Sequence, residues 1–280
     1  MLALLKRNFL LYFRNRSGVF FSLLGALISF ILYIIFLQKN LTDAWAQLPN
    51  GGPVLNNWLM SGTLAVTGIT TSLAVLTQLV KDRERQVDQD LYLSDQGIWR
   101  LAFSYLVSAI IISFFMQVLM YVLMCGYFRE VPTLALLPEV LLIMLLSSLL
   151  SSLVNAIFVH FFQSVDSLGK FATIVGTASG FLVGTYVPLG VLPNFAQLLM
   201  KCTPATYIAA LYRQVLMKEA LSETFKGQDK LLQDFQETMG VQLKWQTLLT
   251  KEQTYLIVLG GILLALGIWI SLAKRSSKRK

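Results

Sequence analysis

The chain has 280 residues, of which 55% are hydrophobic and only 14% are charged. Soluble globular domains carry about 25% charged residues, so this composition excludes an ordinary soluble domain. The formal net charge is +8, which makes the distribution of basic residues along a membrane protein informative.

The first 18 residues, which begin MLALLKRNFLLYFRNR, combine basic charge with an apolar helical face. Arg7 and Arg14 lie on the side opposite to that face. A basic amphipathic helix of this kind lies flat in the membrane interface, with its apolar side among the acyl chains. The alternative is a cytoplasmic extension of the first span. The apolar face holds Leu2, Leu5, Phe9, Tyr12 and Phe13.

Six windows of the chain contain no Asp, Glu, Lys or Arg. About 20 helical residues cross a ~30 Å hydrocarbon core, and one charge at a helix centre costs roughly 2.5–3.5 kcal/mol. We therefore predict an all-α polytopic membrane protein with six transmembrane helices. The first window is too long for a signal-peptide core, and FLQKNL offers no cleavage site, so we expect a retained first span. The windows are residues 19–37, 58–80, 101–128, 140–162, 171–187 and 254–273.

Basic residues lie mainly in the segments on one side of these spans. With the N-terminus inside, the cytoplasmic segments hold fourteen of the 23 Lys and Arg residues but only six of the 15 acidic residues. This is the asymmetry of the positive-inside rule. We expect a multi-pass plasma-membrane protein with cytoplasmic N- and C-termini. The basic charge then faces membrane lipid, and we expect no nucleic-acid partner.

The charged segment after the second span, KDRERQVDQDLYLSDQGIWR, alternates charges with apolar residues. A charge run of this kind is usually a solvated surface. Here the pattern also predicts a short amphipathic helix that presents an apolar edge and mixed charge to a partner protein.

The second and fifth spans are rich in uncharged polar and small residues. Hydroxyl groups either line a path or only pack helices together. Small residues at four-residue spacing form a groove that lets another helix approach closely. The candidate path residues are Thr63, Thr67, Thr70, Thr71, Thr177 and Thr185, and the candidate groove residues are Ala172, Gly176, Gly180 and Gly184.

The segment GTYVPLGVLPNFAQLLMKCTPATYIAALYRQ follows the fifth span and is broken by Pro188, Pro193 and Pro204. Proline fixes φ near −65° and lacks an N–H, so it ends helices. Lys201 and Arg213 are expected to extend toward the outer headgroups. The polar residues up to 253 form a small extracellular part that is too short to fold alone.

Motifs for chemistry are missing from the sequence. The lone His160 belongs to no catalytic spacing, no Cys/His cluster indicates a metal site, and the single Gly169–Lys170 pair lacks the P-loop context. The spans lack the ionisable groups that proton-coupled carriers use. We therefore expect that the chain does not use ATP by itself and is not an enzyme. Whether Cys125 and Cys202 pair is left open.

Two stretches resemble the membrane subunit of ABC-2 type ABC transporters. RERQVDQDLYLSDQGIWRLAFSYLVSAI is similar to the family's loop between spans two and three, and the proline-broken segment is similar to its signature region. Gln86 stands where the family commonly has glycine, and LSDQG replaces its usual threonine–proline. The resemblance implies an ATPase-coupling loop of Arg83, Glu84, Arg85, Asp88, Leu91 and Tyr92, and a re-entrant outer lid that includes Pro188, Pro193, Pro204, Tyr207 and Arg213.

The resemblance also implies a single membrane domain and its partners. The domain covers residues 1–280, with a connecting helix at 1–18, spans one to five at 19–193, the outer segment at 194–253, span six at 254–273 and a basic tail at 274–280. The partners are a second permease subunit, forming a homodimer, and two ABC ATP-binding subunits that carry ATP and Mg. The hydroxyl-rich, uncharged spans with abundant Phe and Met lead us to expect export of an amphipathic or lipid-like molecule, such as a drug, antibiotic or hemolysin-like toxin. The alternatives are a polysaccharide exporter of the same family, an ion-coupled carrier and a membrane-embedded acyl-transfer enzyme that depends on His160.

Overall fold

The structure is a computed structural model that describes residues 1–37, 51–93, 97–129 and 134–278. Within these residues every named element is a helix, and one isolated bridge joins Lys244 to Leu248. Five of the described helices are long and apolar enough to cross a membrane. The prediction of an all-α polytopic membrane protein is therefore confirmed.

The chain begins with two helices in place of one continuous segment. Helix α1 spans Leu2–Arg14 and α2 spans Arg16–Leu32, followed by a π-helical turn η1 at Tyr33–Leu37. Asn15 separates α1 from α2, and its side chain accepts a hydrogen bond from the backbone N–H of Gly18 at 3.1 Å. This side chain caps the start of α2 and fixes the break.

Helix α4, Gly51–Glu84, is the central helix of the bundle. It packs against α2, α6, α7, α8 and α10, and 83% of its apolar window is buried. Its hydroxyl groups are compatible with burial because several return hydrogen bonds to backbone carbonyls one turn earlier, as Thr67 does to Thr63 at 2.8 Å and Ser72 to Gly68 at 2.7 Å. Polarity without charge thus lets this helix occupy the core.

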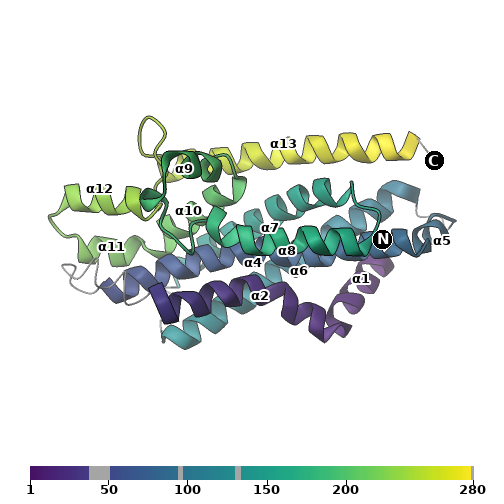
Figure 1. Cartoon of the computed structure of the whole chain (residues 1–280), viewed down its shortest axis with the longest axis horizontal. Helices are drawn as coiled ribbons and strands as arrows, with labels where there is room; N and C mark the ends of the chain where they lie inside the picture. The colour runs from purple at the N-terminus through teal and green to yellow at the C-terminus, as the bar shows by residue number, and fades with distance from the viewer. Residues whose placement is uncertain (38–50, 94–96, 130–133, 279–280) are drawn as a thin grey trace.

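Four further helices complete the bundle around α4. They are α6 at Gly97–Phe128, α7 at Leu137–Val159, α8 at Val165–Leu182 and α13 at Lys251–Lys278. Helix α13 lies along one side of the bundle (Figure 1), and only 17% of its apolar window is buried. Such an apolar, unburied surface is what a lipid-facing helix presents.

The fifth expected span, residues 171–187, ends earlier than the sequence predicts. Helix α8 stops at Leu182, and Gly184 has a φ of +68° in the turn that follows. Glycine adopts this left-handed conformation without steric cost, so it terminates the helix. The described part of α8 has 18 residues, and it is not one of the five helices that meet the length and hydropathy needed for a span.

The segment between α8 and α13 folds as a series of short helices. They are η2 at Leu189–Val191, α9 at Asn194–Lys201, α10 at Pro204–Leu216, α11 at Lys218–Thr224 and α12 at Asp229–Thr238. Pro188 and Pro193 directly precede η2 and α9, and Pro204 is the first residue of α10. The prolines therefore mark the helix boundaries, as the sequence indicates.

The bundle has two distinct ends (Figure 1). Helices α11 and α12 lie at one end, which we call the α12 end, while α5 (Val87–Leu93), the first residue of the chain and the end of α13 lie toward the other, the α5 end. A second small core of Trp58, Met217, Phe225, Phe235 and Met239 packs the short helices against the start of α4.

Candidate functional site

A groove of about 1270 Å³ lies between α1, α2, α4 and α8. It extends from Lys81, Glu84 and Arg85 at the α5 end to Tyr186 and Val187 at the α12 end. Its lining is largely apolar, and hydroxyl and amide groups of α4 and α8 lie among the apolar residues. The polar residues on α4 and α8 are Thr70, Thr77, Gln78, Thr173 and Thr177, and the apolar residues on α2 include Phe21, Leu24, Ile28 and Leu32.

The six candidate path threonines do not lie together. Thr70 and Thr177 line the groove. Thr63, Thr67 and Thr71 are fully buried against the other helices, and Thr185 is buried opposite Gly62. The structure therefore brings only two of the six predicted residues to the groove.

The four residues of the predicted helix-packing groove on α8 also lie in different environments. Ala172 and Gly176 line the large groove between the helices, and no neighbouring side chain or helix lies within 4 Å of a Cβ built on Gly176. A Cβ on Gly180 would meet the ring of Tyr186 at 2.3 Å, so this position is filled by the chain's own tyrosine. Gly184 lies beyond the end of α8. Of the four predicted small residues, only Ala172 and Gly176 remain open to another helix.

The predicted coupling loop contains the end of α4, a turn and α5. Gln86, in the turn, has a φ of +58°. Glycine adopts this conformation readily, and glycine is common at this position in the family that the loop resembles. Arg85 is exposed, Asp88 is buried and Leu91 packs partly against the core. Tyr92 belongs to α5, and its side chain lies outside the described residues.

Arg83 and Glu84 contact the chain itself. One guanidinium nitrogen of Arg83 donates to the carbonyl oxygens of His160 at 3.3 Å and Phe162 at 2.8 Å. Glu84 accepts a hydrogen bond from the backbone N–H of Val165 at 3.4 Å. These contacts join the end of α4 to the turn between α7 and α8.

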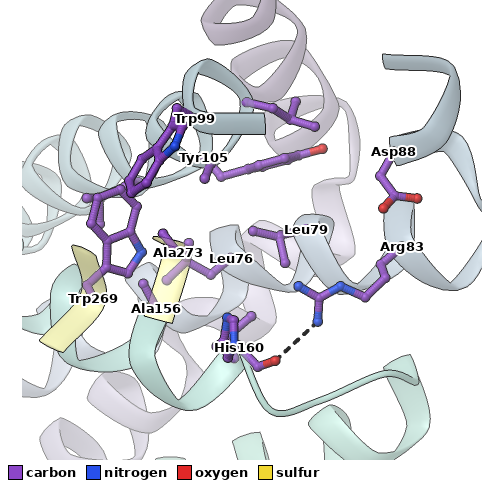
Figure 2. Close-up of a pocket in the computed structure, with 14 residues that line it drawn as sticks. Leu76, Leu79, Arg83, Asp88, Trp99, Tyr105, Ala156, His160, Trp269 and Ala273 are labelled. Carbon is purple, nitrogen blue, oxygen red and sulfur yellow. Dashed lines mark hydrogen bonds between the residues drawn. The ribbon is translucent and has the colours of Figure 1, made fainter. Parts of the chain in front are cut away.

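A small pocket of about 80 Å³ lies on the opposite side of α4 at the same end (Figure 2). Its wall contains Trp99, Trp269 and the lone His160, with Arg83 donating to the His160 carbonyl. Burial lowers the pKa of His160, and the charge of Arg83 lowers it further. Both effects favour the neutral form of His160, which fits a packing role. Among the described residues no group of three His, Cys, Asp or Glu side chains could hold a metal ion.

The predicted lid residues differ widely in environment. Tyr207 donates its hydroxyl to the carbonyl of Lys201 at 2.8 Å and accepts from the indole N–H of Trp245 at 3.1 Å. Pro193 and Pro204 are exposed, while Pro188 is buried. Cys125 is half-buried, Cys202 is exposed, and no disulfide joins them.

The expectation that Arg213 reaches the outer headgroups is wrong. Its side chain is buried, and its guanidinium donates to the carbonyl oxygens of Val183 at 2.9 Å, Gly184 at 2.9 Å and Gly240 at 3.1 Å. Carbonyls left over at the end of α8 and in the turn after α12 thus accept hydrogen bonds from both terminal nitrogens of the buried cation, whereas its Nε has no partner among the described residues.

Sequence reasoning missed a polar residue in the third span. Gln117 is fully buried, accepts a hydrogen bond from the hydroxyl of Tyr212 at 2.8 Å and donates to Ser148 at 2.7 Å. It therefore joins α6 to α7 and α10. Its position in a charge-free window with a serine-rich neighbour was the available signal.

Comparison with known proteins agrees with this architecture. The model of one protein family, described as ABC-2 type transporter, matches residues 1–217. No curated protein matches the chain significantly. The matched part includes α1, the α4–α5 turn, the groove and the start of the short-helix segment through α10. The chain belongs to the ABC-2 type transporter family and is a multi-pass membrane component of an ABC transporter.

Proposed function

We propose that the chain is the permease subunit of an ATP-driven exporter that moves an amphipathic or lipid-like molecule. The observation that carries this proposal is a largely apolar groove that also carries hydroxyl and amide groups of α4 and α8. A molecule with polar and apolar parts fits this lining, because hydroxyl oxygens accept hydrogen bonds and α2 supplies apolar contact.

Family membership implies association with an ABC ATP-binding subunit. We place two such subunits at the α5 end, where Glu84, Arg85 and Gln89 are exposed. ATP and Mg belong to those subunits, since the sequence contains no phosphate-binding loop. The α5 end is cytoplasmic in this proposal, which agrees with the basic residues near it.

A second copy of the chain completes the assembly as a homodimer. The groove is open along α2 and α8, and the open space at Gly176 allows another helix to approach closely. The two grooves then face one another and form one path. The short helices at the α12 end cover this path on the outer side.

The test is transport into inside-out vesicles that contain the chain and its co-expressed ATP-binding subunit, with a fluorescent amphipathic probe. Thr177→Phe places a ring in the groove and should abolish ATP-dependent uptake while basal ATP hydrolysis continues. Ile174→Phe is the control, because Ile174 lies on the same helix, is 64% exposed and does not line the groove. Equal uptake by the two variants would contradict the proposed path.

A further inference from the structure

Three consecutive residues at the α5 end of α4 each contact a different part of the chain. Asp82 contacts α1 and α6, Arg83 donates to the turn after α7, and Glu84 accepts from the first residue of α8. Helix α5 begins only three residues after Glu84. A displacement of α5 therefore acts directly on the residues that hold the bundle together at this end.

Asp82 is the most strongly connected of the three. Its side chain is only 4% exposed, and it accepts hydrogen bonds from the guanidinium of Arg7 at 2.8 Å, the amide of Gln78 at 2.6 Å and the hydroxyl of Tyr105. A buried carboxylate needs such donors, and removing one partner of a buried ion pair leaves an uncompensated charge. The carboxylate thus fixes α1 and α6 to α4 at one level of the bundle.

Helix α1 is attached to the bundle by both apolar and polar contacts. Leu4 and Asn8 are its buried residues, and the Asn8 amide donates to the hydroxyl of Ser108 on α6 at 3.2 Å, one residue after Arg7. Leu2 and Leu10 are 83% and 52% exposed. Phe9 and Tyr12 pack partly against the core, and the Tyr12 and Ser22 hydroxyls are hydrogen-bonded at 2.7 Å. Arg7 and Asn8 supply the polar contacts of α1 with α4 and α6.

The position of α1 matters for the groove. Asn8, Leu11 and Tyr12 line it at the α5 end, together with Lys81 and Arg85 from α4. A shift of α1 relative to α4 would change the width of the groove at this end. The contact between Arg7 and Asp82 thus lies between the proposed docking helix and the groove wall.

We propose that Asp82 is a positioning residue that makes α1 move as one body with the α5 end of α4 and with α6. Displacement of α5 by an ATP-binding subunit is then carried through Asp82 and Arg7 to the groove wall that α1 forms. The mechanical role rests on the proposed function, whereas the attachment of α1 through Asp82 is measurable without it.

The first experiment measures that attachment alone. In the full chain with Cys125→Ser and Cys202→Ser, cysteines replace Asn8 and Ser108, and the rate of oxidative cross-linking between α1 and α6 is recorded in membranes. Asp82→Asn should slow cross-linking, because a weaker contact with Arg7 lowers the fraction of time that α1 lies attached beside α6. An unchanged rate would overturn the proposal.

The matched control is Asp166→Asn. It makes the same chemical change in the ion pair of Asp166 with Lys170, which is 2.7 Å long, with both side chains about three-quarters exposed. Cross-linking between α1 and α6 should be unaffected. Arg7→Gln removes the Asp82 ion pair from its more exposed side, so it provides the same measurement if Asp82→Asn lowers the amount of folded protein.

The second experiment measures coupling in vesicles with the co-expressed ATP-binding subunit. Asp82→Asn should lower the number of probe molecules moved per ATP hydrolysed several-fold, and the oxidised cross-link between α1 and α6 should restore it. A purely structural role for Asp82 would lower the amount of protein but leave this ratio unchanged.

If the cross-link blocks transport when Asp82 is present, α1 and α6 separate during transport and the proposal is overturned. Failure of every variant, including the parent, to transport would contradict the proposed function, and the cross-linking rates would still decide the role of Asp82.

Discussion

The guanidinium carbon of Arg213 lies 5.1 Å from the centre of the Trp58 ring. Trp58 in turn donates its indole N–H to the carbonyl of Met239 at 2.7 Å. Arg213 therefore combines a cation–π contact with hydrogen bonds to three carbonyl groups, and these groups come from the end of α8 and the turn after α12. One buried cation thus connects α10, α4, α8 and the outer segment.

Replacing Arg213 with lysine keeps the charge but removes the planar group that reaches several carbonyls at once. We expect Arg213→Lys to lower the free energy of unfolding by roughly 2–3 kcal/mol, because a buried charge loses hydrogen bonds. Denaturation of the purified protein in detergent measures this. The exposed Arg14→Lys serves as the control, and equal stability of the two variants would refute the role of Arg213.

Gly180 and Gly176 lie one turn apart on α8 and provide a matched pair. Gly180→Ala places a methyl group against the Tyr186 ring and should cost about 1–3 kcal/mol of stability, since overpacking forces neighbours to shift. Gly176→Ala meets open space and should change stability little. Thermal unfolding of both variants checks the prediction, and a larger loss for Gly176→Ala would contradict the packing around α8.

The proposed homodimer predicts a different outcome at Gly176 for a larger side chain. Gly176→Leu should leave the single chain folded, because no atom lies within 4 Å of its Cβ, but it should weaken association with the second copy. Single-molecule subunit counting in membranes measures this. An undiminished dimer fraction would show that this part of α8 does not contact another subunit.

The fold was largely predictable because membrane insertion depends on local composition. Charge-free windows identified α2, α4, α6, α7 and α13, and the prolines identified the boundaries of η2, α9 and α10. The fifth predicted span, residues 171–187, extends beyond the end of α8, since the sequence pattern includes Gly184 among the small residues at four-residue spacing. A glycine in an apolar window serves equally well for close packing and for a left-handed turn, and composition does not separate the two.

The site was less predictable because its contacts join residues far apart in the chain. Arg7 and Asp82 are 75 positions apart, and Tyr212 and Gln117 are 95 positions apart. Arg213 illustrates the same limit. An arginine beside an apolar segment is compatible with headgroup contact, but here its terminal nitrogens donate to the carbonyls of Val183, Gly184 and Gly240 inside the protein.

The turn before α5 yields a prediction about a single backbone angle. Gln86 has a φ of +58°, which costs an L-residue roughly 1–2 kcal/mol relative to its ordinary conformations. Gln86→Gly should therefore preserve or raise stability by up to about 1 kcal/mol, whereas Gln86→Ile should lower it. Unfolding measurements on both variants test this, and greater stability of the isoleucine variant would rule out the observed turn.

The measurement that tests the central claim most directly is photo-cross-linking from α5 in living cells. A photoreactive amino acid replaces Gln89, which is exposed on α5, and in a separate strain it replaces Gln233, which is exposed on α12 at the opposite end of the bundle. We predict that position 89 captures an ABC ATP-binding subunit, identified by mass spectrometry, and that position 233 does not. Capture of that subunit from position 233 alone, or from neither position, would contradict an ATP-driven permease that is coupled through α5.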